Sequence, residues 1–428
     1  MARSGDPFAW VSGRDSAFVA RATAGSSHVL YTKSPGGVLA TAARVAAFRP
    51  LIDAAVRGSG VDPNVLEGIV FVESAGRPYV LAGADVTAAA GLTQILADTG
   101  RSLLGMHIDI ARSRKLLAQA GNASSSAQLS ATLRRLARVD TRFDPRRALA
   151  ATVRYLQLAG QRFGRSDLAV VSYHMGIGNL DHVLTAYDGG RAVPYAQLYF
   201  DTAPDRHATA YALLSGFGDQ SSLYLWRVLG ATGVMQLYRR DPGALTRLAQ
   251  LQTARDSTAA VLHPPEQTKT FADSAALASA YSRGSLVPLP RNPGQVGLGY
   301  SRELGAGAQR LGVEPALYRG LRPAALELLV ELGARVRTLT SDPRAVLILA
   351  GAVADGRYQR SLGVEDPDAR TGYTFSIERR YASRRQAVAF QATLDRLQAL
   401  NLIAWTRSPT KIEVTVASDA SQVIRNGP

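Results

Sequence analysis

The sequence predicts a mainly α-helical N-terminal half, followed by a smaller C-terminal α+β domain. Apolar residues recur at helical spacing through most of the chain up to about residue 285. A stretch rich in proline and glycine, Leu286–Gly299, then interrupts this pattern. Beyond it, short apolar runs typical of strands alternate with helical segments. With 428 residues, the chain is long enough for two or three domains.

These shifts in pattern divide the chain into five parts. Residues 1–38 are rich in Gly, Ser and Ala and show little periodicity, which predicts an arm or a propeptide remnant. We expect an arm and first helix over 1–45, a helical domain over 46–200, a helical connector over 201–285, a linker over 286–320 and an α+β domain over 321–428.

One acidic residue, Glu73, lies on the apolar stripe of a helix in the second part. Asp62 and Pro63 are typical of a helix start, and Gly76 of its end. The stripe itself comprises Leu66, Ile69 and Val70. A carboxylate on this stripe is desolvated, which raises its pKa and suits it to donate a proton near neutral pH. Glu73 is therefore a candidate catalytic acid at a helix end.

Two glycine-containing segments follow downstream. Gly91-Leu-Thr-Gln-Ile95 comes after a loop rich in alanine and glycine and is typical of a tight turn that enters a helix. Ser172-Tyr-His-Met-Gly-Ile-Gly178 closes an apolar helix with glycines that let the backbone approach a ligand.

The order Glu-Ser, Gly-Leu-x-Gln and x-Tyr-x-x-Gly-x-Gly resembles the lysozyme-like domain of soluble lytic transglycosylases, over about residues 46–200. Asp144-Pro145 fits the helix between the second and third motifs of that family. The resemblance implies that Glu73 is the catalytic acid/base and that no cofactor is needed. It also implies a set of sugar-binding residues: Ser74, Gly91, Leu92, Gln94, Tyr173, His174 and Gly176.

The chain departs from the family at three motif positions. Thr93 stands where the family has Met, His174 where it has Asn, and Met175 where it has Ala. These changes bear on substrate preference, whereas Glu73 and Gln94 are in place.

The chemistry depends on whether a second carboxylate faces Glu73. Between Glu73 and Gln94 the only other acid is Asp85. Asp85 either forms an Asx-turn, the interpretation that its Gly-rich loop favours, or activates water, as in goose-type lysozymes. With one acid, the family resemblance implies cleavage of the MurNAc–GlcNAc β-1,4 bond with formation of 1,6-anhydro-MurNAc. The alternatives are a goose-type muramidase and an inactive cell-wall-binding protein.

In the C-terminal part, we expect a helix over Pro323–Leu332 and another over Arg384–Leu400. The expected strands are Val336–Thr340, Val346–Leu349, Tyr373–Ile377, Ile403–Trp405 and Ile412–Val416.

This domain loosely resembles zinc D-Ala-D-Ala-type carboxypeptidases that have lost their metal ligands. Thr371-Gly-Tyr-Thr-Phe-Ser-Ile377 aligns with their metal motif on its glycine. The ligand positions are then occupied by Ala369, Ser376 and Glu413, so the expectation is no metal, because zinc needs three protein ligands. The resemblance implies a peptidase-like accessory groove lined by Arg357, Tyr358 and Gln359.

Composition limits the remaining function classes. The net charge of +15 has two possible causes: a GC-rich genome that favours arginine codons, or a basic surface that suits polyanionic partners such as anionic wall polymers or nucleic acid. No nucleic-acid-binding motif is present. The chain has no cysteine, which excludes disulfides and thiolate metal sites. The chain contains no run of 18 apolar residues, the length that would indicate a transmembrane segment. With peptidoglycan glycan strands as substrate, we expect an extracellular or cell-wall location, although no export signal is visible in this chain.

Overall fold

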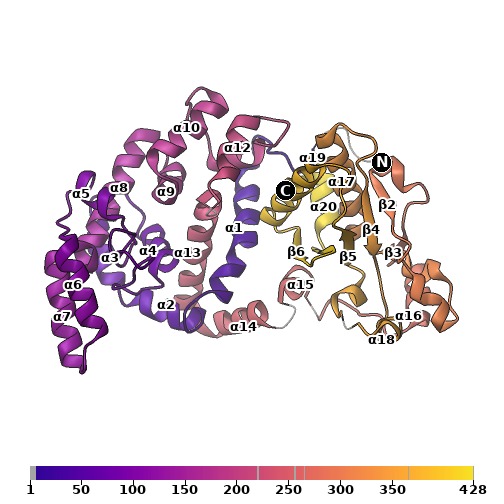
Figure 1. Cartoon of the computed structure of the whole chain (residues 1–428), viewed down its shortest axis with the longest axis horizontal. Coiled ribbons are helices and arrows are strands. Elements are labelled where there is room, and N and C mark those ends of the chain that lie inside the picture. Colours follow the sequence, from indigo (N-terminus) through magenta and orange to yellow (C-terminus); the bar gives the residue numbers. More distant parts are fainter. Residues whose placement is uncertain (1–5, 219–220, 255–256, 265, 365, 428) are drawn as a thin grey trace. The chain divides into compact units, whose positions relative to one another are not determined.

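The computed structural model describes residues 6–218, 221–254, 257–264, 266–364 and 366–427. The chain divides into two compact units (Figure 1). We call residues 26–198 and 213–250 the helical unit, and residues 1–25, 199–212 and 251–428 the sheet unit. Each unit is described by itself below.

The core of the helical unit includes α4 (Pro63–Ser74), whose Leu66, Val70 and Phe71 are buried in it. The chain enters it within α1 (Asp15–Thr32). The other helices are α2 (Val38–Ala46), α3 (Arg49–Val56), α5 (Ala97–Ser102), α6 (Ile110–Gly121), α7 (Ser126–Val139), η1 (Thr141–Phe143), α8 (Pro145–Phe163), α9 (Ser166–Met175), α10 (Ile177–Asp188), η2 (Ser221–Leu223), α13 (Tyr224–Arg240) and most of α14 (Pro242–Thr253).

The close approach of α13 to α4 defines the core of this unit. Leu66 and Val70 of α4 are fully buried in a cluster with Met235 of α13. A Cβ at Gly68 would lie 2.7 Å from the backbone oxygen of Val228, so a side chain at this position would separate the two helices. Glycine therefore brings these helices together at the level of the α4 backbone.

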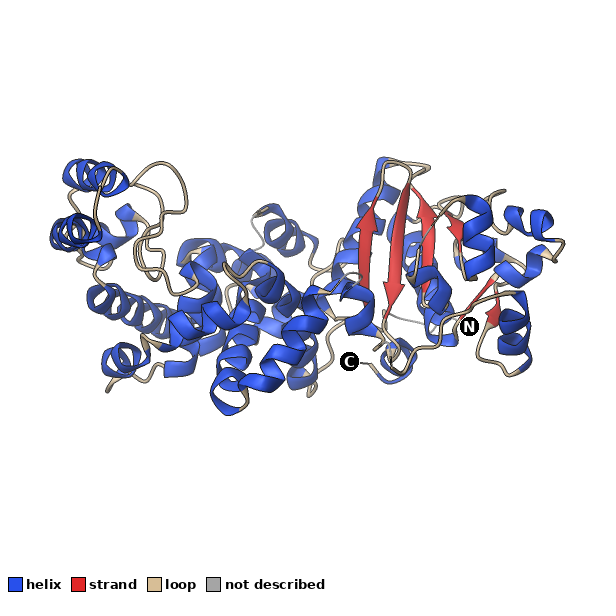
Figure 2. Cartoon of the chain, turned by 90° about the horizontal axis from the view of Figure 1, so that it is seen from below, coloured by secondary structure: helices blue, strands red, loops and turns tan. Residues whose placement is uncertain are grey.

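The sheet unit contains a five-stranded sheet in the order β2-β4-β5-β7-β6. Figure 2 shows the strands in red. Its strands are β2 (Leu298–Tyr300), β4 (Leu347–Gly351), β5 (Thr374–Glu378), β6 (Ile403–Arg407) and β7 (Lys411–Val416). Strands β2 and β4 are parallel, whereas the other neighbours are antiparallel. The short strands β1 (Val287–Pro288) and β3 (Gly320–Leu321) form a separate antiparallel pair.

Helices and 3-10 turns complete the sheet unit. Helix α17 (Pro323–Thr340) is longest, and α19 (Arg384–Ala399) and α20 (Ala420–Asn426) pack against it. Two helices are shared between the units: α11 (Tyr195–Asp201) begins in the helical unit, and α12 (Ala208–Gly216) ends in it. The remaining elements of the sheet unit are α15 (Ser257–Leu262), α16 (Ser274–Ser282), η3 (Pro293–Val296), η4 (Ala306–Leu311), η5 (Pro315–Tyr318), α18 (Gly356–Leu362) and η6 (Asp368–Thr371).

The predicted fold class is confirmed: the chain is mostly helical, with a smaller C-terminal region that contains the sheets. Two local predictions were wrong. The segment expected as a linker, residues 286–320, supplies β2 to the main sheet and β1 to the small one. Residues Val336–Thr340, expected as a strand, complete α17, because Val336 continues the inward face of that helix.

The expected connector, residues 201–285, is not one element. Helix α13 belongs to the core of the helical unit, and residues 251–285 belong to the sheet unit. The apolar spacing in this segment reflects the burial of α13 against α4. From the local pattern alone, a core helix could not be distinguished from a connecting helix.

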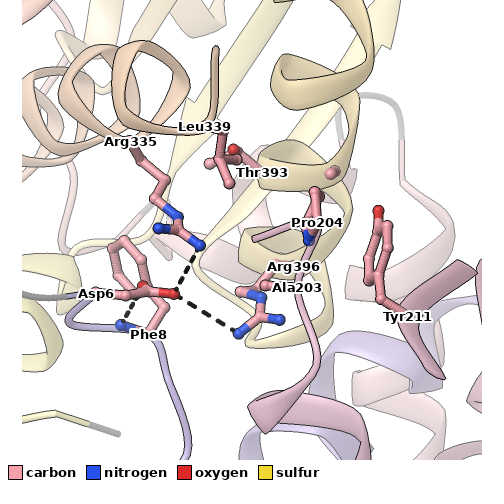
Figure 3. Close-up of a pocket in the computed structure, with 10 residues that line it drawn as sticks. Asp6, Phe8, Ala203, Pro204, Tyr211, Arg335, Leu339, Thr393 and Arg396 are labelled. Atoms are coloured by element: carbon pink, nitrogen blue, oxygen red, sulfur yellow. Dashed lines mark hydrogen bonds and ion pairs between the residues drawn. The ribbon is translucent and has the colours of Figure 1, made fainter. Parts of the chain in front are cut away.

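The N-terminal segment is also more ordered than its composition predicts. It contains α1, in which Phe18 is fully buried against Phe200, with ring centroids 4.9 Å apart. Before the helix, the Asp6 carboxylate lies 3.5 Å from Arg335 and 3.8 Å from Arg396, beside a cavity of only about 10 Å³ (Figure 3). These charges therefore anchor the segment within the sheet unit. Across the described ranges, no helix has both the length and the apolar character needed to cross a membrane.

Candidate functional site

Glu73 lies in the last turn of α4, where the chain reverses sharply. The helix begins as its sequence predicts, with the Asp62 carboxylate accepting a hydrogen bond from the backbone N–H of Asn64. It ends at Ala75 and Gly76, both with left-handed backbone angles (φ of 55° and 72°). The Arg44 guanidinium on α2 donates to the Ala75 carbonyl at 3.0 Å and fixes this terminus. Glu73 is thus held at the end of a rigid element.

The partner of Glu73 is Tyr224, the first residue of α13. The Tyr224 hydroxyl donates a hydrogen bond of 2.6 Å to Oε1 of Glu73. Tyr224 is only 2% exposed, so this bond is shielded from competing water.

Two ion pairs to one buried carboxylate hold α13 against α4. The Glu67 carboxylate, which is fully buried, lies 3.2 Å from Arg49 of α3 and 2.6 Å from Arg239 of α13. Because Glu67 and Glu73 share one helix, and Arg239 and Tyr224 share another, these ion pairs also fix Tyr224 relative to Glu73.

The environment of Glu73 suits a proton donor. Burial raises its pKa from the ordinary 4.5 to about 7, and the hydrogen bond from Tyr224 partly opposes this rise. Burial, reinforced by the nearby Glu73 charge, holds the pKa of Tyr224 well above its usual range, so Tyr224 remains a donor. At neutral pH, Glu73 therefore exchanges readily between acid and base forms.

Aromatic rings extend from Tyr224 along one side of the site. His174 stacks on Tyr224 at a centroid distance of 5.0 Å, and Tyr173 lies nearly parallel to it at 6.4 Å. The Tyr173 hydroxyl donates to the carbonyl of Thr93 at 2.7 Å. Tyr173 therefore connects the third sequence motif to the second, and the exposed His174 ring lies at the outer end of the stack.

The Gly91–Gln94 segment is held by its own backbone geometry. Gly91 has a φ of 83°, and a Cβ there would lie 1.9 Å from the carbonyl oxygen of Arg142. Gln94 also has a left-handed backbone (φ of 51°), and its side-chain amide donates to the carbonyls of Val80 and Gly91 at 3.0 and 2.9 Å. Only glycine fits at the first position, and Gln94 maintains the turn.

Beneath this segment is a fully buried ion pair. Arg142 lies 2.7 Å from Asp140, and neither side chain is exposed to solvent. The same guanidinium donates to the carbonyls of Val86 and Ala88 at 2.7 and 2.8 Å. Arg142 therefore organises the loop that carries the second motif, a function that no local sequence signal indicated.

The structure brings Glu73, Tyr173 and His174 together through Tyr224, whereas Ser74 and Leu92 are buried. The Ser74 hydroxyl donates to the Val70 carbonyl within α4. Leu92 packs in the same core cluster as Leu66 and Val70, and contact of either Ser74 or Leu92 with sugar stays a prediction. Gly176, with φ of 89°, forms the junction of α9 and α10.

Tyr224 is the residue that sequence reasoning missed. It lies 151 positions from Glu73, in a segment expected to be a connector. Its only local signal was a tyrosine at the start of an apolar helix, which is also typical of ordinary core packing.

Asp85 occupies an exposed turn. Its carboxylate accepts a hydrogen bond of 3.0 Å from the backbone N–H of Thr87 and lies 3.4 Å from Arg114. The Thr87 backbone hydrogen bond is the largest cause of the lowered pKa of Asp85. These are the properties of an Asx-turn, the interpretation that the loop composition favoured.

In the sheet unit, only one of the three expected accessory-groove residues is exposed. Arg357 reaches solvent, but Tyr358 is buried in a ring stack with Tyr318 at 4.0 Å. The Gln359 amide is also buried and donates to the Asp366 carbonyl at 2.5 Å. Two of the three residues thus maintain the fold of α18, so a groove formed by all three is not present.

The positions aligned with zinc ligands lie on or near the main sheet. Ser376 and Glu413 are directly opposite each other on β5 and β7, and Ala369 packs in a hydrophobic cluster. Carboxylate oxygens of Asp366, Asp368 and Glu413 lie within 4.8 Å of one another. Burial, and then the neighbouring aspartates, raise the pKa of Glu413 to about 7. That this region binds no metal stays a prediction.

Comparison with known proteins agrees with the geometry of the helical unit. A search of curated proteins found no match to the chain. Residues 50–191 match the family described as the transglycosylase SLT domain. The match includes Glu73 and the Gly91 and Tyr173 motifs, and it ends before Tyr224. Residues 50–191 of this chain are therefore a transglycosylase SLT domain, a type of domain that acts on peptidoglycan.

Proposed function

We propose that this protein is a peptidoglycan lytic transglycosylase in which Glu73 is the single catalytic acid/base. The observation that carries the proposal is the Glu73–Tyr224 pair: a carboxyl group at a helix end, with its pKa raised to about 7, held by a buried hydroxyl. The SLT match supplies the substrate class. The exposed Asx-turn at Asp85 argues against this residue as a second catalytic carboxylate.

The proposed reaction has two proton transfers at one carboxyl group. Glu73 protonates the glycosidic oxygen between MurNAc and GlcNAc while the acetamido oxygen of MurNAc attacks C1. Glu73, now ionised, accepts the proton of the C6 hydroxyl. The C6 oxygen then displaces the acetamido oxygen from C1, which closes the 1,6-anhydro ring without the addition of water. Tyr224 orients Glu73 throughout and stabilises its ionised form.

Mass spectrometry of fragments released from purified peptidoglycan tests this proposal. We expect products that end in 1,6-anhydro-MurNAc, each lighter by one water than the corresponding hydrolytic fragment, because Glu73 takes its second proton from the C6 hydroxyl and not from water. Predominantly reducing ends would instead establish a goose-type muramidase, and the absence of any released fragment would indicate an inactive wall-binding protein.

The pH dependence tests the role of Tyr224. Because the first step needs protonated Glu73, we expect kcat/KM to fall as the pH rises through about 7. In Tyr224→Phe, the Glu73 carboxylate loses a hydrogen bond that favours its ionised form, so the pKa of Glu73 rises. The basic limb of the pH profile, where kcat/KM falls, then moves to higher pH. We expect less than about a tenfold change in rate at pH 5.

Tyr238→Phe, on the same helix, is the matched control and should leave the basic limb in place. An unmoved limb in Tyr224→Phe, together with a uniform loss of rate at every pH, would show that Tyr224 acts only in packing.

For the sheet unit we propose an accessory, non-catalytic role at the cell wall. Support comes from the loss of the zinc-ligand side chains at Ala369 and Ser376. We also propose that the protein is exported from the cytoplasm to reach its substrate.

A further inference from the structure

A basic hollow lies between α6 and α7, which form a helical hairpin in the SLT domain. Its volume is about 370 Å³. Its lining combines four cations with two apolar residues: Arg112, Lys115, Leu116, Arg135, Arg138 and Val139. Arg112 and Lys115 are three positions apart on α6, and Arg135 and Arg138 are three apart on α7, so each helix presents a pair of cations on one face.

The charges of this hollow are poorly neutralised by the protein. Residues 110–139 contain six cations and no acid. Within the described ranges, the single carboxylate paired with a cation of the hollow is Asp109, 3.4 Å from Arg112. By contrast, many arginines elsewhere in the helical unit pair with carboxylates, among them Arg49, Arg142, Arg162, Arg165, Arg191 and Arg239. Four like charges around one hollow repel one another, and an anionic ligand would relieve this cost.

The size and lining of the hollow indicate the chemistry of that ligand. A volume of about 370 Å³ has room for more than a single carboxylate or phosphate group, and the four cations that line the hollow suit a ligand with more than one negative charge. Guanidinium groups bind carboxylates in bidentate fashion. Leu116 and Val139 add an apolar surface that suits methyl groups. A short peptide with several carboxylates and alanine side chains fits this combination better than a phosphodiester polymer does.

The hairpin shares its core with the second motif of the candidate site. Leu116 and Leu136, one from each helix, are buried with Ala90 and Phe143. Ala90 directly precedes Gly91, and Ser113 of α6 donates to the buried Asp140 carboxylate at 3.1 Å. The hollow is therefore built on the same scaffold that holds the Gly91–Gln94 segment.

We propose that the hollow between α6 and α7 binds the carboxylates of peptidoglycan stem peptides, and so selects glycan strands that carry peptides. This inference rests on the proposed function, because it assigns a second part of the same substrate to the same domain. Charge neutralisation in the hollow then contributes to substrate affinity, and its effect decreases at high ionic strength.

The test compares Arg135→Gln/Arg138→Gln with the control Arg134→Gln/Arg146→Gln. Both variants remove two exposed cations, but the control residues do not line the hollow. On intact peptidoglycan we expect the first variant to raise KM about fivefold to tenfold with kcat unchanged. We expect no change in KM on the same glycan after an amidase has removed its peptides. The control variant should match the native protein on both substrates.

A binding assay separates this inference from the proposed function. The probe is the synthetic stem tetrapeptide L-Ala-γ-D-Glu-meso-diaminopimelate-D-Ala, titrated by NMR into the full chain. We expect binding by the native protein and the control, and about fivefold to tenfold weaker binding by Arg135→Gln/Arg138→Gln, whether or not the protein cleaves glycan. The inference is overturned if both variants bind the tetrapeptide equally, or if the first variant loses affinity only for soluble poly(glycerol phosphate).

Discussion

Replacement of Glu73 by glutamine is expected to lower the rate of peptidoglycan cleavage by about 10²–10⁴-fold, the usual contribution of a general acid. Glutamine keeps the shape of the side chain and can still accept the hydrogen bond from Tyr224, but it cannot deliver a proton. The measurement is the initial rate of fragment release from purified peptidoglycan. A variant that retained a quarter of the native rate would remove Glu73 from the mechanism.

The Glu73→Gln variant should remain folded, and pH-dependent stability can verify this. Burial raises the pKa of Glu73 from 4.5 to about 7 in the folded chain, so ionisation disfavours the folded state. The native protein therefore loses stability as the pH rises from about 4.5 through 7, and Glu73→Gln does not undergo this loss. We expect the melting temperature of the variant at pH 8 to equal or exceed that of the native protein.

Asp85→Asn is the matched control for this experiment. Asparagine can still accept the hydrogen bond from the Thr87 N–H, so the turn is retained. We expect its rate to stay within about twofold of the native rate, because a surface substitution away from the reacting atoms has little effect. A loss as large as that of Glu73→Gln would establish Asp85 as the water-activating base of a muramidase.

The second large effect is expected for Arg142→Met. This change leaves the Asp140 carboxylate buried without its counter-charge, and it deprives the carbonyls of Val86 and Ala88 of their donors. Removal of one partner of a buried pair typically costs about 3–5 kcal/mol. We expect hydrogen-exchange protection to fall by about 10²–10⁴-fold at the amides of Ala90 and Ile95, which bond to each other's carbonyls.

Two further variants show whether the uncompensated charge causes this loss. Arg147→Met removes an exposed arginine 3.8 Å from Asp144 and should cost about 0–1 kcal/mol. Asp140→Asn combined with Arg142→Met removes both charges and keeps an acceptor for the Ser113 hydroxyl, so it should recover part of the protection. Unchanged exchange in Arg142→Met would show that the loop is stable without the pair.

The sequence predicted the helices and strands of this protein well where their bounds depend on residues close together in the chain. The helix that carries Glu73 begins and ends at its expected signals, and its apolar stripe is buried. Four of the five expected C-terminal strands are present as β4, β5, β6 and β7. The fifth, Val336–Thr340, is helical because α17 packs against α19 and α20, a tertiary contact that overrides the local preference of valine and threonine for strands.

The sequence by itself determined the class of the fold, the two kinds of domain and the acid at the centre of the candidate site, since helix caps and apolar periodicity act over a few residues. Tertiary structure alone decided that Tyr224 binds Glu73, that Arg142 supports the Gly91 segment, and that residues 286–320 supply two strands. These features join residues that are far apart in the chain. They depend on the approach of whole elements, such as α13 to α4 at Gly68, and on the burial that makes each hydrogen bond and ion pair effective.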